Sequence, residues 1–272
     1  MNNIANRIHN EILNVSYSKL FDIDIPWNSA EVFECACKLD FDGIKGDVTP
    51  TKDGKLVMCH DAEFWFDENG RVYEPGNTGV YEKKICEMTY EECKQLEYAT
   101  EAAKNHLGYY AKVAGLEDMI SICHKYSKFP YITVRDTEID MCVDEVYELL
   151  SKYNLTDKCI INSFSLDTLK AMRKKDENIY LSQVQDLNIT LTKAMIDDAV
   201  ELKNCMICAF WSVKDKQMFD DMYEKSAEAI EYAKEKGVIL YLAHGADKES
   251  YKTGLERGFK GFQCTVSDAF LD

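Results

Sequence analysis

Asp47, His60 and Asp61 are the side chains of this sequence whose types and spacing best suit proton transfer. Residues 43–48 form a predicted short buried strand that delivers Asp47 at its carboxyl end. Residues 55–59 alternate as a second short strand that ends on His60 and Asp61. The Lys-Asp-Gly segment between the two strands predicts a tight turn, because glycine adopts the positive φ that such a turn needs. A carboxylate and an imidazole are therefore expected at one end of a hairpin, which suits acid–base chemistry on an anionic substrate.

Short apolar strands alternate with helical stretches along the chain, a pattern that predicts a closed parallel sheet. We therefore predict a (β/α)8 TIM barrel that forms a single domain over residues 1–272, because no repeat or linker divides the chain. The predicted strands cover residues 17–25, 43–48, 131–135, 159–163, 180–184, 206–211, 238–243 and 261–265. The predicted helices cover residues 8–15, 29–39, 116–126, 138–153, 166–173, 193–202, 216–236 and 251–257.

Two helix starts are predicted from capping residues. Ser29 is a good N-cap for the helix that runs to Leu39. A further helix is expected after Thr89, where Glu92 completes a capping box. This last helix lies in the longest excursion between strands, at about 62–115.

Composition limits the partners of this chain of 272 residues. The formal charge of −16 argues against nucleic acid and against an anionic membrane surface, so an anionic substrate requires a local basic site. The 11 cysteines lack Cys-x-x-Cys spacing, which favours reduced core thiols and a cytoplasmic location. The N-terminus lacks the apolar run of a signal peptide, and no stretch is long enough to span a membrane.

Residues 45–61 resemble the motif of the glycerophosphodiester phosphodiesterases, Glu-x-Asp-Val-x-x-Thr-x-Asp-Gly-x-x-Val-x-x-His-Asp, at every position except the first. Residues 26–29, Pro-Trp-Asn-Ser, are similar to the Pro-Glu-Asn-Thr element that precedes it in the family. The resemblance implies a (β/α)8 barrel and a phosphoric diester hydrolase of lipid metabolism. Such an enzyme cleaves a small glycerophosphodiester into an alcohol and a phosphomonoester.

The resemblance also implies where this chain departs from the family site, which uses two histidines and Mg²⁺ or Ca²⁺ held by three carboxylates. His60 keeps the second histidine position, and Asp47 is the only retained metal-ligand position. Lys45 stands where the first glutamate is expected, and an ammonium cannot ligate a cation. Thr133 replaces the second glutamate, whereas Arg135 keeps the phosphate-binding charge two residues later and adds a bidentate fork.

The first histidine of the family, part of a His-Arg pair, aligns with Ser18-Lys19 when counted back from Asn28. In that alignment the histidine is lost and Lys19 keeps the neighbouring cation. In another register of this strand, Asp22 or Asp24 enters the site as a ligand instead.

These substitutions predict an ion pair between Lys45 and Asp47 in place of a metal, and no cofactor is expected. The predicted catalytic residues are His60, Asp47 and Lys45, and the predicted phosphate-binding residues are Arg135, Lys19 and Lys45. An alternative is a catalytically inactive relative that binds a phosphorylated small molecule or a protein partner. A third possibility is metal-free transfer to a cyclic product. The oligomeric state is left open.

Three further features have both a functional and a structural interpretation. His244 is either a replacement histidine or a loop residue without a role. Trp211 either lines the pocket or packs in the core. The aromatic run 64–66 either forms an apolar wall for the alcohol part of the substrate or packs the excursion.

Overall fold

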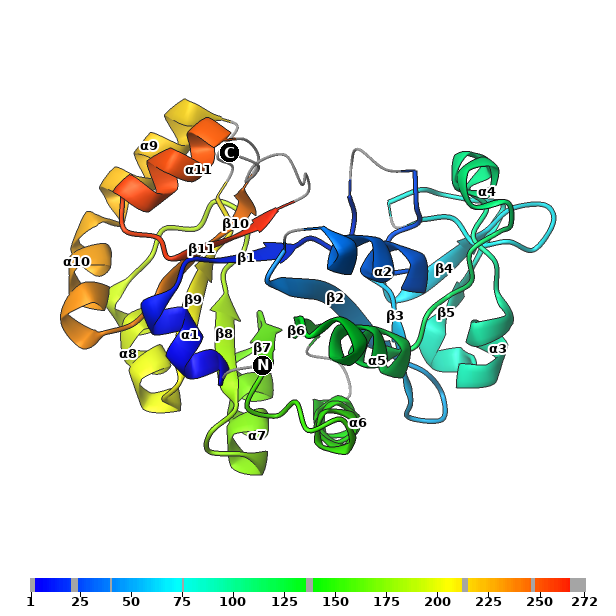
Figure 1. Ribbon diagram of the computed structural model, residues 1–272, viewed down its shortest axis with the longest axis horizontal. Coiled ribbons are helices and arrows are strands. Elements are labelled where there is room, and N and C mark those ends of the chain that lie inside the picture. The colour runs from blue at the N-terminus through cyan, green and yellow to red at the C-terminus, as the bar shows by residue number, and fades with distance from the viewer. Residues whose placement is uncertain are drawn as a thin grey trace.

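Eight parallel strands of the computed structural model close into a barrel (Figure 1). The structure describes residues 3–20, 24–39, 41–74, 76–135, 139–211, 215–245 and 248–264. In order around the ring the strands are β1 (Leu13–Ser16), β2 (Gly43–Pro50), β6 (Phe129–Val134), β7 (Ile160–Ser163), β8 (Tyr180–Val184), β9 (Cys205–Ala209), β10 (Leu240–Gly245) and β11 (Gly261–Cys264). The ring is closed because β1 pairs in parallel with both β11 and β2. The predicted (β/α)8 TIM barrel is confirmed.

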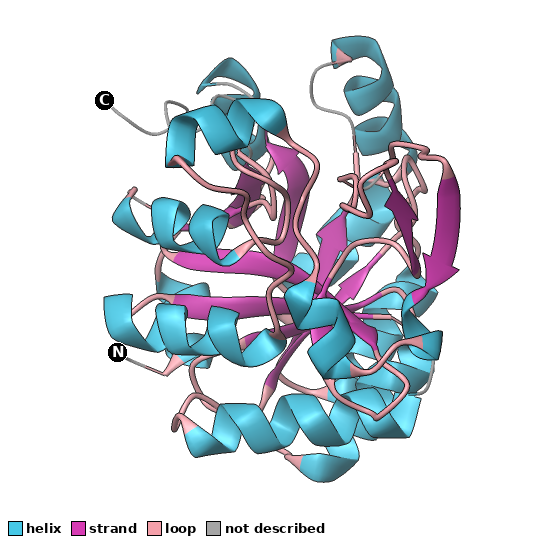
Figure 2. Ribbon diagram, turned by 90° about the vertical axis from the view of Figure 1, so that its right-hand side faces the viewer, coloured by secondary structure: helices cyan, strands magenta, loops and turns pink. Residues whose placement is uncertain are grey.

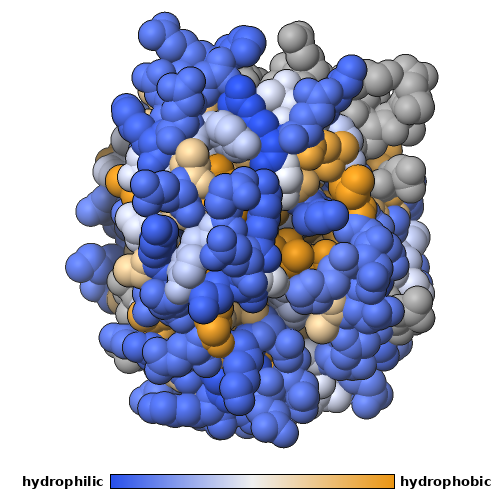
Figure 3. Space-filling view, turned by 90° about the vertical axis from the view of Figure 1, so that its left-hand side faces the viewer, coloured by the Kyte–Doolittle hydropathy of each residue, from blue (hydrophilic) through white to orange (hydrophobic). Residues whose placement is uncertain are grey.

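Helices cover the outer face of this barrel (Figure 1). They are α2 (Ala30–Lys38), α5 (Leu116–Tyr126), α6 (Ile139–Lys152), α7 (Leu166–Lys175), α8 (Lys193–Leu202), α9 (Lys216–Lys225), α10 (Ala227–Lys236) and α11 (Lys248–Glu256). Their apolar faces pack against the outside of the barrel strands and form a core there. The surface over α8 to α11 is mostly hydrophilic (Figure 3). Ser29 caps α2 as predicted, since its hydroxyl accepts a hydrogen bond from the Val32 amide. Among the described residues, no helix has the length and apolar character needed to cross a bilayer.

The N-terminal segment differs from the prediction. The first helix, α1 (Ile4–Asn10), begins four residues before the predicted range of 8–15 and overlaps it only at residues 8–10. Residues 13–16 form β1. Residues 17–20 and 24–25, which were predicted as strand, are not strand. The physical reason is the alternation of Leu13 and Val15, which places both side chains in the barrel interior beside Ile4 and Ile8 of α1. The apolar residues at 17–20 and 24–25 were therefore a sign of burial and not of strand pairing.

The helix predicted at 216–236 is two helices, α9 and α10, which meet at Ser226. Ser226 is fully buried, and its hydroxyl accepts a hydrogen bond from the Leu191 amide. That tertiary contact fixes a break that helix periodicity does not reveal. The other predicted elements agree with the structure within a few residues.

The excursion after β2 begins with β3 (Leu56–Met58), which pairs antiparallel with β2 and so extends the sheet of the barrel. The rest of the excursion forms a layer beside the barrel (Figures 1 and 2). This layer contains the hairpin β4 (Glu63–Phe66) and β5 (Tyr81–Lys84), a 3-10 turn (Ile85–Glu87), α3 (Tyr90–Gln95) and α4 (Glu101–Leu107). The predicted capping box of Thr89 and Glu92 begins α3. A core of its own holds this layer together, and the buried side chains of Phe64, Phe66 and Tyr98 belong to it.

Candidate active site

A cavity of about 70 Å³ lies at the carboxyl ends of the barrel strands. Because side chains alternate along a strand, inward-facing positions two apart supply most of its lining. One side, which we call the polar wall, comes from the ends of β1, β2, β3, β6 and β7: Tyr17, Lys45, Asp47, His60, Thr133, Arg135 and Asn162. The opposite side, the apolar wall, comes from the ends of β7 to β10: Phe164, Val184, Phe210 and Ala243. Gln263 of β11 completes the ring of lining residues.

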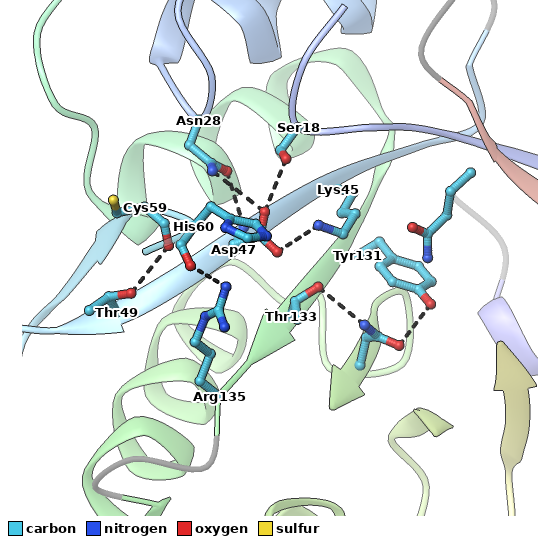
Figure 4. A network of polar contacts seen from close by, with 12 residues as sticks. Ser18, Asn28, Lys45, Asp47, Thr49, Cys59, His60, Tyr131, Thr133 and Arg135 are labelled. Carbon is cyan, nitrogen blue, oxygen red and sulfur yellow. Dashed lines mark hydrogen bonds and ion pairs between the residues drawn. The ribbon is translucent and has the colours of Figure 1, made fainter. Parts of the chain in front are cut away.

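Lys45 and Asp47 form the ion pair expected from the sequence (Figure 4). Lys45 Nζ lies 2.6 Å from Asp47 Oδ1, and both side chains are buried. The other carboxylate oxygen accepts hydrogen bonds from Ser18 Oγ at 3.0 Å and from Asn28 Nδ2 at 3.5 Å. Burial opposes ionisation of Asp47, but the charge of Lys45 and these donors outweigh it and lower the pKa of Asp47 to about 2. Asp47 is therefore a fixed anion at neutral pH, with donors on both oxygens.

Asn28 connects the end of β1 to β2. Its backbone adopts a left-handed φ of 54°, which asparagine tolerates better than most residues. The Asn28 amide donates to the Ser18 carbonyl, and its Oδ1 accepts from the Asp47 amide at 3.1 Å. The Pro-Trp-Asn-Ser element thus serves to hold Asp47 in place.

His60 and Asp61 lie beside this ion pair, just beyond β3. His60 Nδ1 lies 2.7 Å from Asp61 Oδ1, while the other oxygen of Asp61 accepts a hydrogen bond from the Gly76 amide. The hydrogen bond from His60 is the largest influence that lowers the pKa of Asp61. An ionised Asp61 favours the proton on Nδ1, which leaves Nε2 of His60 for proton transfer. The ring of Trp27 meets the His60 ring edge-on at 6.0 Å.

Arg135 extends the polar wall from the end of β6. One of its terminal nitrogens donates to the backbone carbonyl of His60, which ties β6 to the hairpin that carries the histidine. Its Nε is buried and has no acceptor among the described residues. Arg135 therefore keeps donor capacity toward the cavity side of the barrel.

Lys19 is not among the residues that line the cavity. Its Nζ lies 3.5 Å from Glu74 and 4.9 Å from the centre of the Trp27 ring, at the outer edge of the site. Of the residues of the other register, Asp24 is exposed and Asp22 lies outside the described residues. The structure thus brings together Lys45, Asp47, His60 and Arg135 of the predicted site, and leaves Lys19 outside the cavity.

Asn162 and Tyr17 line the cavity but were not predicted, and Asn162 contacts Thr133, the residue at the second glutamate position. Thr133 accepts a hydrogen bond from Asn162, whose carbonyl in turn accepts one from the Tyr131 hydroxyl. An asparagine within the apolar strand at 159–163 is the feature of the sequence from which Asn162 could have been found. Tyr17 places its ring 4.6 Å below Lys45 Nζ, and burial is the main cause that raises the pKa of this tyrosine.

The structure places the other aromatic candidates mainly in the hydrophobic cores. Trp211 is fully buried and packs against Phe219 and Phe259, so it belongs to the core. Phe64 and Phe66 are buried in the core of the excursion, which favours the packing alternative for these two residues. The backbone of His244 lies in β10, but its side chain is outside the described residues.

The described residues do not fit the divalent ion that the sequence resemblance implies. Asp47 is the single carboxylate among the described lining residues, and protein donors already occupy its oxygens. Within the described ranges, no three His, Cys, Asp or Glu side chains are grouped so as to hold a metal ion. Mg²⁺ and Ca²⁺ require several oxygen ligands, and a lysine ammonium supplies none.

Comparisons with known proteins point to one family. The family model "Glycerophosphoryl diester phosphodiesterase family" matches residues 22–262. A glycerophosphodiester phosphodiesterase of Bacillus subtilis (strain 168) is 27% identical over 65% of this chain and 60% of its own length. One from Caldanaerobacter subterraneus is 24% identical over 56% of this chain and 58% of its own length. The matched segments thus span somewhat less than two thirds of these curated relatives.

Solved structures extend the likeness to the whole fold. A putative glycerophosphoryl diester phosphodiesterase from Silicibacter pomeroyi has a TM-score of 0.74 at 14% identity, covering 94% of this chain and 91% of that one. A phosphodiesterase from Oleispira antarctica, in complex with the product sn-glycerol-3-phosphate, has a TM-score of 0.71 at 13% identity, covering 94% and 93%.

Proposed function

We propose that this chain, which belongs to the glycerophosphoryl diester phosphodiesterase family, hydrolyses a small glycerophosphodiester to an alcohol and a phosphomonoester. The observation that carries the proposal is the convergence of Lys45, Arg135 and His60 on one cavity at the carboxyl ends of the strands. Two cations beside a histidine suit a phosphodiester anion, and they supply the local basic site that a protein of charge −16 needs. A related fold that holds sn-glycerol-3-phosphate supports the same ligand class.

The residues of the polar wall would divide the work of hydrolysis. Lys45 and Arg135 would hold the non-bridging phosphate oxygens and stabilise the charge that develops on them. As water attacks phosphorus and the bond to the alcohol oxygen breaks, His60 would donate the Nε2 proton to the departing alkoxide. Water would release its own proton to solvent, and His60 would be reprotonated from solvent. Asp47 would hold Lys45, and Asp61 would orient His60.

The fixed ammonium of Lys45 would replace the electrostatic role of a divalent ion. The 2.6 Å contact with Asp47 supports this assignment, because it uses the one retained ligand position. We further propose a cytoplasmic location, which is supported by the spacing of the 11 cysteines, because it does not suggest a disulfide framework.

The test measures alcohol release from a panel of glycerophosphodiesters with and without chelator. We expect turnover that survives chelation, and His60→Ala should lower it ~10²–10⁴-fold, the usual contribution of a proton-transfer group. The matched control is His106→Ala, because His106 is an exposed histidine on α4. Loss of turnover on chelation in the parent protein would refute the proposal that Lys45 replaces a divalent ion.

A non-catalytic phosphate-binding role is the second candidate. It is favoured by the state of Asp47, whose pKa of about 2 and fully occupied oxygens leave it without ligand or base capacity. The same panel separates the two. Phosphate binding by calorimetry without any alcohol release would establish the binding role.

A further inference from the structure

The apolar wall of the cavity carries an aromatic side chain that folding leaves half exposed. Val184 and Ala243 are buried and belong to the interior core of the barrel. Phe164, in contrast, lines the same cavity while half of its surface, 50%, is exposed. A half-exposed phenylalanine beside a buried charged pair gains little from folding, so a ligand is the natural partner for its ring.

The loop after β8 adds apolar surface next to this wall. Leu187 is 54% exposed and Ile189 is 43% exposed. The loop is held against the end of β9, because the Asn188 amide donates to the Phe210 carbonyl at 2.9 Å. Trp211 Nε1 donates to the Ile189 carbonyl at 2.8 Å and fixes its far end. Three large, partly exposed apolar side chains thus lie at the carboxyl ends of β7 and β8.

The size of the cavity indicates which part of a substrate reaches this surface. Sites that enclose a whole small molecule measure ~300–1,000 Å³, whereas this cavity measures about 70 Å³. A phosphoryl group on the polar wall would fill much of it. The alcohol substituent therefore has to leave across the rim, and on the side of β7 to β9 that rim is apolar.

We propose that the substrate carries an aliphatic chain on the alcohol side of its phosphate, and that Phe164 is the residue that selects for it. This inference rests on the proposed function, since it takes the phosphate position from that site. The chemical class is a phosphodiester of glycerol with an aliphatic alcohol of several carbons. A sugar-like alcohol would place hydroxyl groups against Phe164 and Phe210 without hydrogen-bond partners.

The experiment measures calorimetric binding of inorganic phosphate, methyl phosphate, butyl phosphate and hexyl phosphate at constant salt. Burial of one methylene corresponds to about fourfold in affinity. We therefore expect butyl phosphate to bind at least ~10-fold more tightly than methyl phosphate, because the rim covers its chain only in part. Phe164→Ala should reduce this ratio to below ~3, and Phe164→Leu should retain part of it. The matched control is Val200→Ala, because Val200 is 43% exposed on the outside of α8; it should leave the ratio unchanged.

The outcomes separate this inference from the proposed function. Phosphate binding with equal affinity for methyl and butyl phosphate overturns the inference and leaves the phosphate site intact. Failure of all four anions to bind overturns the phosphate site and the inference with it. A parent-like melting curve of Phe164→Ala shows that the change acts at the rim and not on folding.

Discussion

The two walls of the cavity are built by different physical means. On the polar wall, one carboxylate has three partners: Asp47 forms an ion pair with Lys45 and accepts hydrogen bonds from Ser18 and Asn28. On the apolar wall, the chain positions Phe164 without burying it. Directional contacts fix charged atoms to within a fraction of an ångström, whereas apolar contact tolerates shape changes. The polar wall therefore sets the chemistry, and the apolar wall can change its preference with little effect on the fold.

The largest change in stability is expected from Asp47→Asn, which removes the counter-charge of Lys45 from the polar wall. The Lys45 ammonium is 5% exposed and would lose its counter-charge, which typically costs about 3–5 kcal/mol of unfolding free energy. Urea denaturation measures the loss. The control is Asp144→Asn, because Asp144 pairs with Lys175 at 2.8 Å on the surface. Its midpoint should not move, and equal shifts in both variants would contradict a special role for the buried pair.

The pH dependence of the same variant gives an independent check. The pKa of Asp47 is about 2 in the folded protein, below its ordinary value of 3.8. A lowered carboxyl pKa stabilises the fold above about pH 4, and this contribution is lost as the pH falls through about 2. Between those values the parent should lose roughly 2 kcal/mol more than Asp47→Asn. Glu34, whose pKa is also about 2, is present in both proteins and cancels in the difference.

A second change would convert the polar wall to a metal site. In Lys45→Glu with Thr133→Glu, three carboxylates would surround the position that Lys45 now fills, because Asp47 remains. We expect millimolar Ca²⁺ to raise the melting temperature of the double variant and chelator to reverse the rise. The single change Lys45→Glu should respond weakly. A comparable Ca²⁺ response in the parent protein would count against the proposal that Lys45 replaces a divalent ion.

A smaller effect is expected from Asp61→Asn, which loosens the polar wall without removing a proton donor. His60 would lose the charged partner of Nδ1, so its ring would spend less time with the proton on that nitrogen. Turnover should fall by about tenfold, less than the ~10²–10⁴ expected for loss of the imidazole. Asp67→Asn, in a turn of the excursion, is the control. Unchanged turnover and pH profile in Asp61→Asn would remove the orienting role of Asp61.

The sequence predicted the barrel and the polar half of the site better than the rest. Periodicity and capping residues located most helices, and the motif around Asp47 and His60 located the strand ends that meet. The ion pair was predicted because Lys45 stands at a metal-ligand position of the family motif. The structure adds that Lys45 and Asp47 lie two apart on one strand and share a face. The phosphate-binding role of Lys19 stays a prediction. Lys19 lies in irregular backbone after β1, where strand alternation no longer fixes the direction of a side chain.

The apolar wall could not be predicted, for a different reason. A single phenylalanine at a strand end looks the same in sequence whether it packs inward or faces a ligand. Trp211 and Phe164 both follow the end of a barrel strand, yet the first is fully buried and the second is half exposed. Only the packing of the neighbouring helices and loops decides between them. The break at Ser226 has the same origin, since a contact distant in sequence produces it.

The separate core of the excursion has a consequence for heat inactivation. Lys45 and Asp47 stand on β2, and Arg135 directly follows β6 of the barrel. Cys59, which precedes His60, is instead buried in the excursion core. The amide that steadies Asp61 also belongs to the excursion. The histidine and the cations thus depend on two cores that need not melt together. If the excursion core is the weaker of the two, proton transfer by His60 should end at the temperature at which that core opens, while the barrel stays folded.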